Sequence, residues 1–116
     1  MKDFQDAPIV QKVYDYYRDL HLAVEKFPKK DKYSIGVKVE TQTLDLIELI
    51  FEATNAGKSE KTRPLEKAGA KTDLIKLLIR LAYEIKAIDQ KKYLSLEEQV
   101  QEIGKMIGGW LKYCKE

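Results

Sequence analysis

The feature that most constrains this chain is the recurrence of apolar residues at steps of three and four along nearly its whole length. This spacing places side chains on one face of an α-helix, which turns once every ~3.6 residues. The first such segment covers about residues 8–26 and ends before Pro28; its face carries Ile9, Val13, Tyr16, Leu20, Val24 and the adjoining Phe27. No strand-like alternation extends beyond a few residues, so the sequence predicts an all-α fold.

Three further helices are predicted, over about residues 31–56, 64–88 and 95–115. Gly57 follows the second and can cap it in the left-handed conformation. Pro64 suits the first turn of the third. Ser95 and Glu98 form a capping box at the start of the fourth. Four long helices with short links predict an antiparallel up-down-up-down four-helix bundle, with residues 1–116 as a single domain.

Composition narrows the class of protein further. Of the 116 residues, 44% are hydrophobic, enough for one core, and the net charge of +2 does not mark a nucleic-acid binder. The lone Cys114 excludes an internal disulfide and fits a reducing compartment. The segment Met1–Asp6 has no apolar signal core, and no apolar run approaches the ~20 residues that span a bilayer. We therefore expect a cytoplasmic protein with no membrane segment.

The residues that could carry chemistry do not form a reactive set. His21 is the only histidine and has no triad partner or metal-ligating companion at helical spacing. Cys114 lies on the apolar stripe of the last helix, which favours a buried thiol. Gly57–Ser59 is similar to the end of a phosphate-binding loop, but Glu52 stands where that loop needs its first glycine. We expect no catalytic residue, no metal site, no cofactor and no enzyme activity.

Basic residues gather around the start of the third helix and continue along its polar face. Cations there can bind anions, or can belong to a solvated face with local ion pairs such as Arg80 with Glu84. Composition alone favours the solvated face. The candidates for nucleic-acid or partner binding are Lys58, Lys61, Arg63, Lys67, Lys71, Lys76 and Arg80.

The third and fourth helices also indicate packing beyond a single bundle. From Leu74 onward the third helix is apolar over more than half its circumference, whereas a surface helix needs an arc of only ~100° or a little more. A second contact, most simply with another subunit, is expected at Leu74, Leu77 and Leu81. Glycines in a helix allow close approach of a neighbour, inside the bundle or between subunits, and these alternatives stay open for Gly104, Gly108 and the adjacent Trp110.

Four segments in order along the chain resemble one known family: Phe27–Lys30, Ala56–Ser59, Asp73–Arg80 and Ile103–Leu111. The chain resembles the accessory variability determinant proteins of diversity-generating retroelements, four-helix bundles related to proteins encoded in intervening sequences of ribosomal RNA. The resemblance implies a barrel-shaped homopentamer with a basic surface. It would bind a reverse transcriptase and RNA or DNA during mutagenic copying, without catalysis of its own, and would use Lys76 and Arg80 for partner binding.

An alternative stays open. The chain would then be an oligomer of the intervening-sequence group that acts only through protein contacts. Genomic neighbourhood separates the two: a nearby reverse transcriptase gene supports the first reading, and a position inside a ribosomal RNA gene supports the second.

Overall fold

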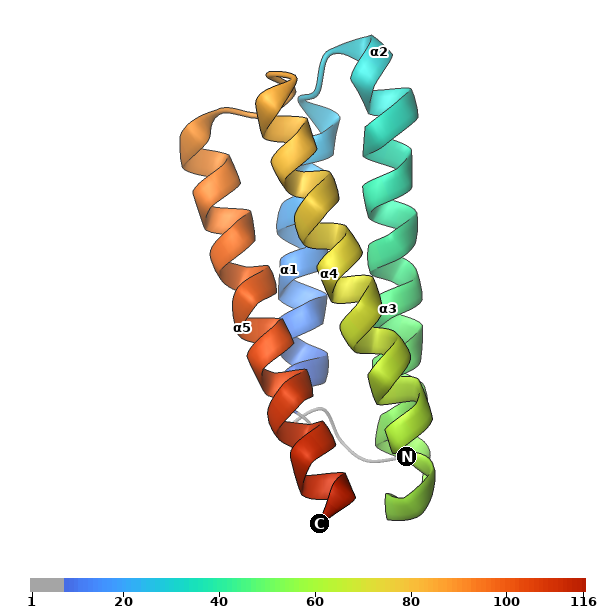
Figure 1. The fold of residues 1–116 in the computed structure, drawn as a ribbon. Helices are drawn as coiled ribbons and strands as arrows, with labels where there is room; N and C mark the ends of the chain where they lie inside the picture. Colours follow the sequence, from blue (N-terminus) through green and yellow to red (C-terminus); the bar gives the residue numbers. More distant parts are fainter. Residues whose placement is uncertain (1–7) are drawn as a thin grey trace.

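The computed structural model describes residues 8–116, and all its regular structure in that range is helical. The described residues form four long helices, which lie lengthwise against one another (Figure 1). The second of them is built from α2, a π-helical turn and α3 in succession. The elements are α1 (Pro8–Glu25), α2 (Lys29–Asp31), the π-helical turn (Lys32–Gly36), α3 (Val37–Asn55), a 3₁₀ turn (Lys58–Glu60), α4 (Thr62–Glu84) and α5 (Gln90–Lys115). The all-α prediction is confirmed; the expectation for Met1–Asp6 lies outside the described residues.

The described part of the chain is elongated, with extents of 44 × 23 × 21 Å. Contacts at both ends of α4 and α5 hold these two helices together along their length. Near the 84–90 connection, the rings of Tyr83 and Tyr93 stack with centroids 4.6 Å apart. At the other end, Lys115 Nζ lies 3.5 Å from Glu66 Oε2.

One stripe of each long helix is buried, largely where the periodicity predicts it. All six predicted residues from Ile9 to Phe27 are buried, as are Val39, Leu46 and Ile50 on α3. Phe51, which follows Ile50, is instead 42% exposed. On α4 the core takes a different face from the one that carries Leu77 and Leu81; its buried members are Pro64, Leu65, Ala68, Thr72, Ile75, Ile79 and Ala82.

The second helix begins earlier than predicted, directly after Pro28, and passes through the π-helical turn before α3. Gly36 ends this turn at a close approach to α1. A Cβ added at Gly36 would lie 2.9 Å from Val24 Cγ1 and 3.2 Å from the Asp31 carbonyl oxygen. Only glycine fits here without displacing its neighbours, because the second of these atoms belongs to the backbone.

The fourth long helix starts at Gln90, so the prediction of a start near residue 95 is wrong. The N-cap is Asp89, whose Oδ1 accepts from the Lys92 N–H at 2.8 Å. Asp is as good an N-cap as Ser, and a start at Gln90 adds the turn that brings Tyr93 onto Tyr83. Ser95 therefore lies inside the helix, and no capping box forms there.

The third long helix ends at Glu84, four residues before the predicted end. The Ala87 N–H donates to the Ala82 carbonyl at 2.8 Å, and the Lys86 N–H donates to the Tyr83 carbonyl at 3.0 Å. This pair of bonds is a Schellman motif, which requires a left-handed residue just past the helix. Lys86 fills that position with φ of 68° and turns Ala87 and Ile88 into the core.

None of the described helices combines the length and apolarity that crossing a membrane requires. The hydroxyl of Tyr16 is buried in the core without a hydrogen-bond partner, although the Thr43 hydroxyl is near it. The Thr43 hydroxyl donates instead to the Val39 carbonyl at 2.9 Å.

Candidate partner-binding surfaces

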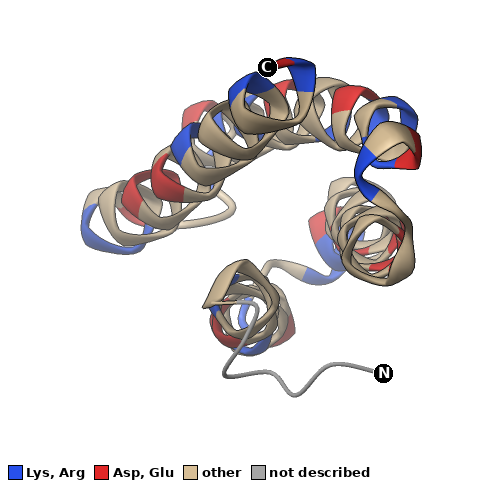
Figure 2. Cartoon of the chain, turned by 90° about the horizontal axis from the view of Figure 1, so that it is seen from below, with Lys and Arg blue, Asp and Glu red and all other residues tan. Residues whose placement is uncertain are grey.

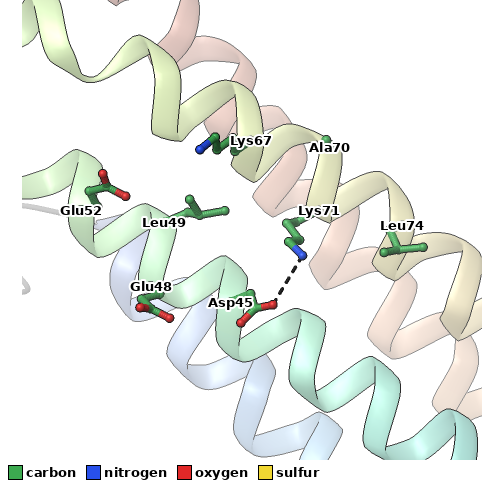
Figure 3. A pocket seen from close by; sticks show the side chains of 8 residues that line it. All are labelled: Asp45, Glu48, Leu49, Glu52, Lys67, Ala70, Lys71 and Leu74. Carbon is green, nitrogen blue, oxygen red and sulfur yellow. Dashed lines mark hydrogen bonds and ion pairs between the residues drawn. The ribbon is translucent and has the colours of Figure 1, made fainter.

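An open groove of about 550 Å³ runs between α3 and α4. Figure 3 shows its two walls: the acidic side chains and Leu49 come from α3, and the lysines, Ala70 and Leu74 come from α4. The lining residues are Asp45, Glu48, Leu49, Glu52, Lys67, Ala70, Lys71 and Leu74. The groove thus includes three of the residues that the sequence singled out, Lys67, Lys71 and Leu74.

Lys71 joins the two walls. Its Nζ donates to Gln42 Oε1 at 2.6 Å and lies 3.4 Å from Asp45 Oδ2. Gln42 is buried, so Lys71 satisfies a polar group that would otherwise lack a partner. This lysine therefore helps to hold α3 and α4 together. Lys67 is exposed on the same wall and forms no ion pair with any of residues 8–116.

Lys61 closes the C-terminal end of α3 and is half-buried. Its ammonium group donates to three carbonyl oxygens there: those of Ala53 at 2.5 Å, Ala56 at 2.7 Å and Thr54 at 3.4 Å. These carbonyls carry the negative end of the helix dipole, which a cation stabilises. The predicted left-handed cap at Gly57 is wrong: Gly57 is extended, with φ of −68°, and Lys61 supplies the cap instead.

Two aromatic side chains of α5 lie beneath lysines from the connection between α3 and α4. Lys61 Nζ is 5.4 Å from the Trp110 ring centroid, and Lys58 Nζ is 4.5 Å from that of Tyr113. Both separations are within the range of cation–π attraction. Trp110 therefore packs inside its own bundle, below the Lys61 cap. Arg63 is exposed beside this cluster and has no ion-pair partner among the described residues.

Lys76 and Arg80, the basic pair on α4, make different local contacts. Arg80 Nε lies 3.0 Å from Glu84 Oε2, the local ion pair weighed from the sequence. Lys76 extends over α5, where its Nζ would lie 3.8 Å from a Cβ added at Gly104. Gly104 thus faces its own bundle, whereas nothing lies within 4 Å of a Cβ added at Gly108.

The outer face of α4 is apolar and has no covering element. Leu77 is 63% exposed, and Leu81 and Ile85 are each 44% exposed. Leu74 continues this line into the groove.

A second exposed apolar line, which was not predicted from the sequence, lies on α3. Val37, Leu44 and Phe51 are exposed and recur every seven residues, which places them on one face. The signal for it was the heptad spacing in the sequence.

His21 and Cys114, the two residues weighed for chemistry from the sequence, lie on α1 and α5. His21 Nδ1 lies 2.8 Å from Glu40 Oε1, which also accepts from the Tyr17 hydroxyl at 2.8 Å. The hydrogen bond to Glu40 raises the pKa of His21, and desolvation together with Glu40 raises the pKa of Tyr17 to about 12. Cys114 is half-buried. The described residues hold no group of three His, Cys, Asp or Glu side chains that could bind a metal ion.

The structure also gathers lysines that are far apart in the sequence. Residues 25–38 and 84–92 lie at the same end of the bundle, the upper end in Figure 1, and together form what we term the lysine end. Eight lysines and four acids give this end a charge of +4, so the other residues of the +2 chain sum to −2. Figure 2, seen from the opposite end, shows acidic and basic segments interleaved along the helices. The lysines are Lys26, Lys29, Lys30, Lys32, Lys38, Lys86, Lys91 and Lys92.

Comparison with protein families identifies a match over most of the chain. The model of a family described as bAvd-like matches residues 8–114, a range that extends from the start of α1 into the last turn of α5. Comparison with curated proteins and with solved structures finds no significant match.

Proposed function

Because the chain belongs to the bAvd-like family, whose model matches residues 8–114, we propose that it is a non-enzymatic accessory protein of a diversity-generating retroelement. In this role it forms an oligomeric scaffold that binds the reverse transcriptase and RNA or cDNA during mutagenic copying. The family match carries the proposal, because it extends over nearly the whole helical part of the chain.

The outer faces of α3 and α4 support the oligomer. Fully burying one leucine side chain is worth about 1.5–3 kcal/mol, so an uncovered line of Leu77, Leu81 and Ile85 favours association. A ring of identical subunits needs two different surfaces on each chain, one for each neighbour. The α4 line and the α3 line of Val37, Leu44 and Phe51 supply two such surfaces. The homopentamer implied by the resemblance is the ring we propose.

The helix order also belongs to the proposal. An antiparallel up-down-up-down arrangement agrees with the contacts of α4 and α5, where Tyr83 meets Tyr93 at one end and Glu66 meets Lys115 at the other. In this arrangement the connection that follows α1 and the connection between α4 and α5 both lie at the lysine end of each subunit. A ring of subunits would therefore repeat that end around its axis.

Light scattering on the purified full chain tests the oligomer. We expect a single species several times the 13.5 kDa of the chain at micromolar concentration. Leu77→Glu combined with Leu81→Glu should dissociate it, because burying two unpaired carboxylates at an interface is strongly unfavourable. Leu22→Glu, at an equally exposed leucine of α1, is the matched control and should leave the oligomer intact. A monomeric wild-type chain would refute the scaffold.

Co-purification tests the partner. The chain should retain the reverse transcriptase encoded beside its gene, and the Leu77→Glu/Leu81→Glu variant should retain less of it. A gene position inside a ribosomal RNA gene, with no reverse transcriptase gene nearby, would contradict the retroelement role and favour the intervening-sequence group.

A further inference from the structure

The lysine end carries a net charge of +4 from eight lysines and four acids. None of its eight lysines forms an ion pair with a described residue. Two of its four acids are already engaged, since Glu84 pairs with Arg80 and the Asp89 side chain caps α5. Like charges gathered at one end of a bundle repel one another, and salt screens this repulsion only over the ~8 Å Debye length of physiological salt. A bound polyanion would relieve that repulsion.

Lys86 adds an observation that is independent of the charge count. It occupies the left-handed position of the Schellman motif, where glycine is the favoured residue. For an L-residue with a side chain, this conformation costs roughly 1–2 kcal/mol. The side chain of Lys86 makes no hydrogen bond or ion pair within residues 8–116 that would offset that cost. Strain kept at an exposed lysine points to a role for its charge.

An exposed aromatic side chain lies beside one of these lysines. Tyr33, in the π-helical turn, is 67% exposed, and Lys32 Nζ is 5.9 Å from its ring centroid. Proteins that bind single strands combine lysines along the backbone of the nucleic acid with exposed aromatic rings on which unpaired bases stack. A duplex offers no free base face to such a ring, so Tyr33 favours a single strand.

We propose that the lysine end is a binding site for single-stranded nucleic acid, with phosphates on the lysines of both segments and a base stacked on Tyr33. This proposal rests on the proposed function only for the source of the strand, the RNA or cDNA of the retroelement. Because the bundle is 23 × 21 Å across, one subunit accommodates a few nucleotides.

The site differs from the basic region that the sequence singled out. Lys61, Lys71 and Arg80 make contacts within the fold, and Lys58 lies over Tyr113. Those side chains would have to give up these contacts to meet a phosphate. Among the lysines of the lysine end, only Lys32 makes such a contact, with the ring of Tyr33.

Fluorescence anisotropy with labelled oligo(U) and oligo(dT) of about twelve nucleotides tests the site. The key variant replaces four exposed lysines by glutamine: Lys29, Lys30, Lys91 and Lys92. For single strands the slope of log affinity against log salt is about −0.7 per phosphate contact, so the slope should become shallower by about 3. The matched control makes the same change in net charge at the opposite end, replacing Lys58, Arg63, Lys67 and Lys112, and should lower affinity much less.

Two single substitutions sharpen the test. Tyr33→Leu keeps an apolar side chain but removes the stacking surface, and should weaken binding about tenfold with little change in the salt slope. Lys86→Gly should weaken binding and make the slope shallower by about 0.7, while raising the melting temperature because glycine relieves the backbone strain. Circular dichroism and the melting temperature establish that each variant is folded.

Several results would overturn the inference. Wild-type affinity in the Lys29/Lys30/Lys91/Lys92 variant would do so, as would an equal loss in the control, which would show a response to net charge alone. Tighter binding to duplex than to single strands would remove the role of Tyr33, and binding only to vesicles with anionic lipid would assign the lysine end to a membrane surface. Oligomer mass and co-purification of the reverse transcriptase are read separately, so the proposed function can survive this failure.

Discussion

Replacing Lys61 by methionine tests whether this residue is a structural cap. The substitution keeps an unbranched side chain of similar length and removes the ammonium group. In the wild type that group donates to the carbonyl oxygens of Ala53, Thr54 and Ala56 and lies over the ring of Trp110. Lys61→Met leaves the end of α3 without its cation while changing little of the packing.

The size of the effect follows from these contacts. A partly buried cation at a helix C-terminus is worth up to ~2 kcal/mol, and a hydrogen bond to a charged group is worth roughly 1.5–3 kcal/mol. The cation–π contact adds about 0.5–1 kcal/mol. Water can reach part of this half-buried site and replace some bonds, so we expect a net loss of about 2–3 kcal/mol.

Urea denaturation followed by circular dichroism measures this loss. For a domain of this size, 2–3 kcal/mol should lower the midpoint by roughly 1–2 M. The control is Lys58→Met, because Lys58 also lies over an aromatic ring but donates to no carbonyl; its loss should stay under about 1 kcal/mol. Protein concentration is held constant, since association would shift the midpoint.

A midpoint for Lys61→Met within error of the wild type would refute the cap. So would an equal loss in Lys58→Met, because the carbonyl contacts would then contribute nothing beyond the ring contact. A folded Lys61→Met variant that binds oligonucleotides with unchanged affinity would agree with the structural role.

Three further predictions concern the core and its edges. Gly36→Ala should destabilise the fold by about 1–3 kcal/mol in thermal melts, because the added methyl group overlaps α1, whereas Gly109→Ala, with no atom within 4 Å, should stabilise it by roughly 0.5–1 kcal/mol; equal effects would contradict the close approach. Tyr16→Phe should leave the melting temperature unchanged or raise it, because it removes a buried hydroxyl without a partner; a loss above about 1 kcal/mol would mean that the hydroxyl is satisfied. Glu40 raises the pKa of His21 above its ordinary 6.5, so this pair stabilises the fold below that pH and the stabilisation is lost as pH rises through the folded-state pKa. The urea midpoint of the wild type minus that of His21→Gln should therefore decrease as the pH is raised from 6 to 9. If this difference does not change with pH, the coupling is excluded.

The sequence alone determined the fold class and most of the core. Residues such as Val13, Leu20, Ile50 and Ile103 recur at the helical period, and a helix that buries one stripe must bury these. The exposed leucines of α4 were also readable, because their stripe exceeds what a single bundle covers. These predictions succeed because they depend on spacing within one helix.

Helix ends were less predictable, since several local signals compete and the wider fold selects among them. Ser95 had the pattern of a cap, yet Asp89 caps α5, because the earlier start lets Tyr93 pack on Tyr83. Gly57 had the pattern of a left-handed cap, yet that conformation occurs at Lys86. A cap depends on which turn best fits the packing beyond it, and that packing involves residues distant in sequence.

The roles of the charged residues were decided only by the tertiary structure. Lys61 and Lys71 stood in one basic segment with Arg63 and Lys67, but the fold places carbonyl oxygens around the first and Gln42 beside the second. The same fold brings residues 25–38 to the same end as residues 84–92, more than forty positions later in the chain. Electrostatic interactions depend on the distance between charges in space. For residues on different helices, spacing along the chain does not specify that distance.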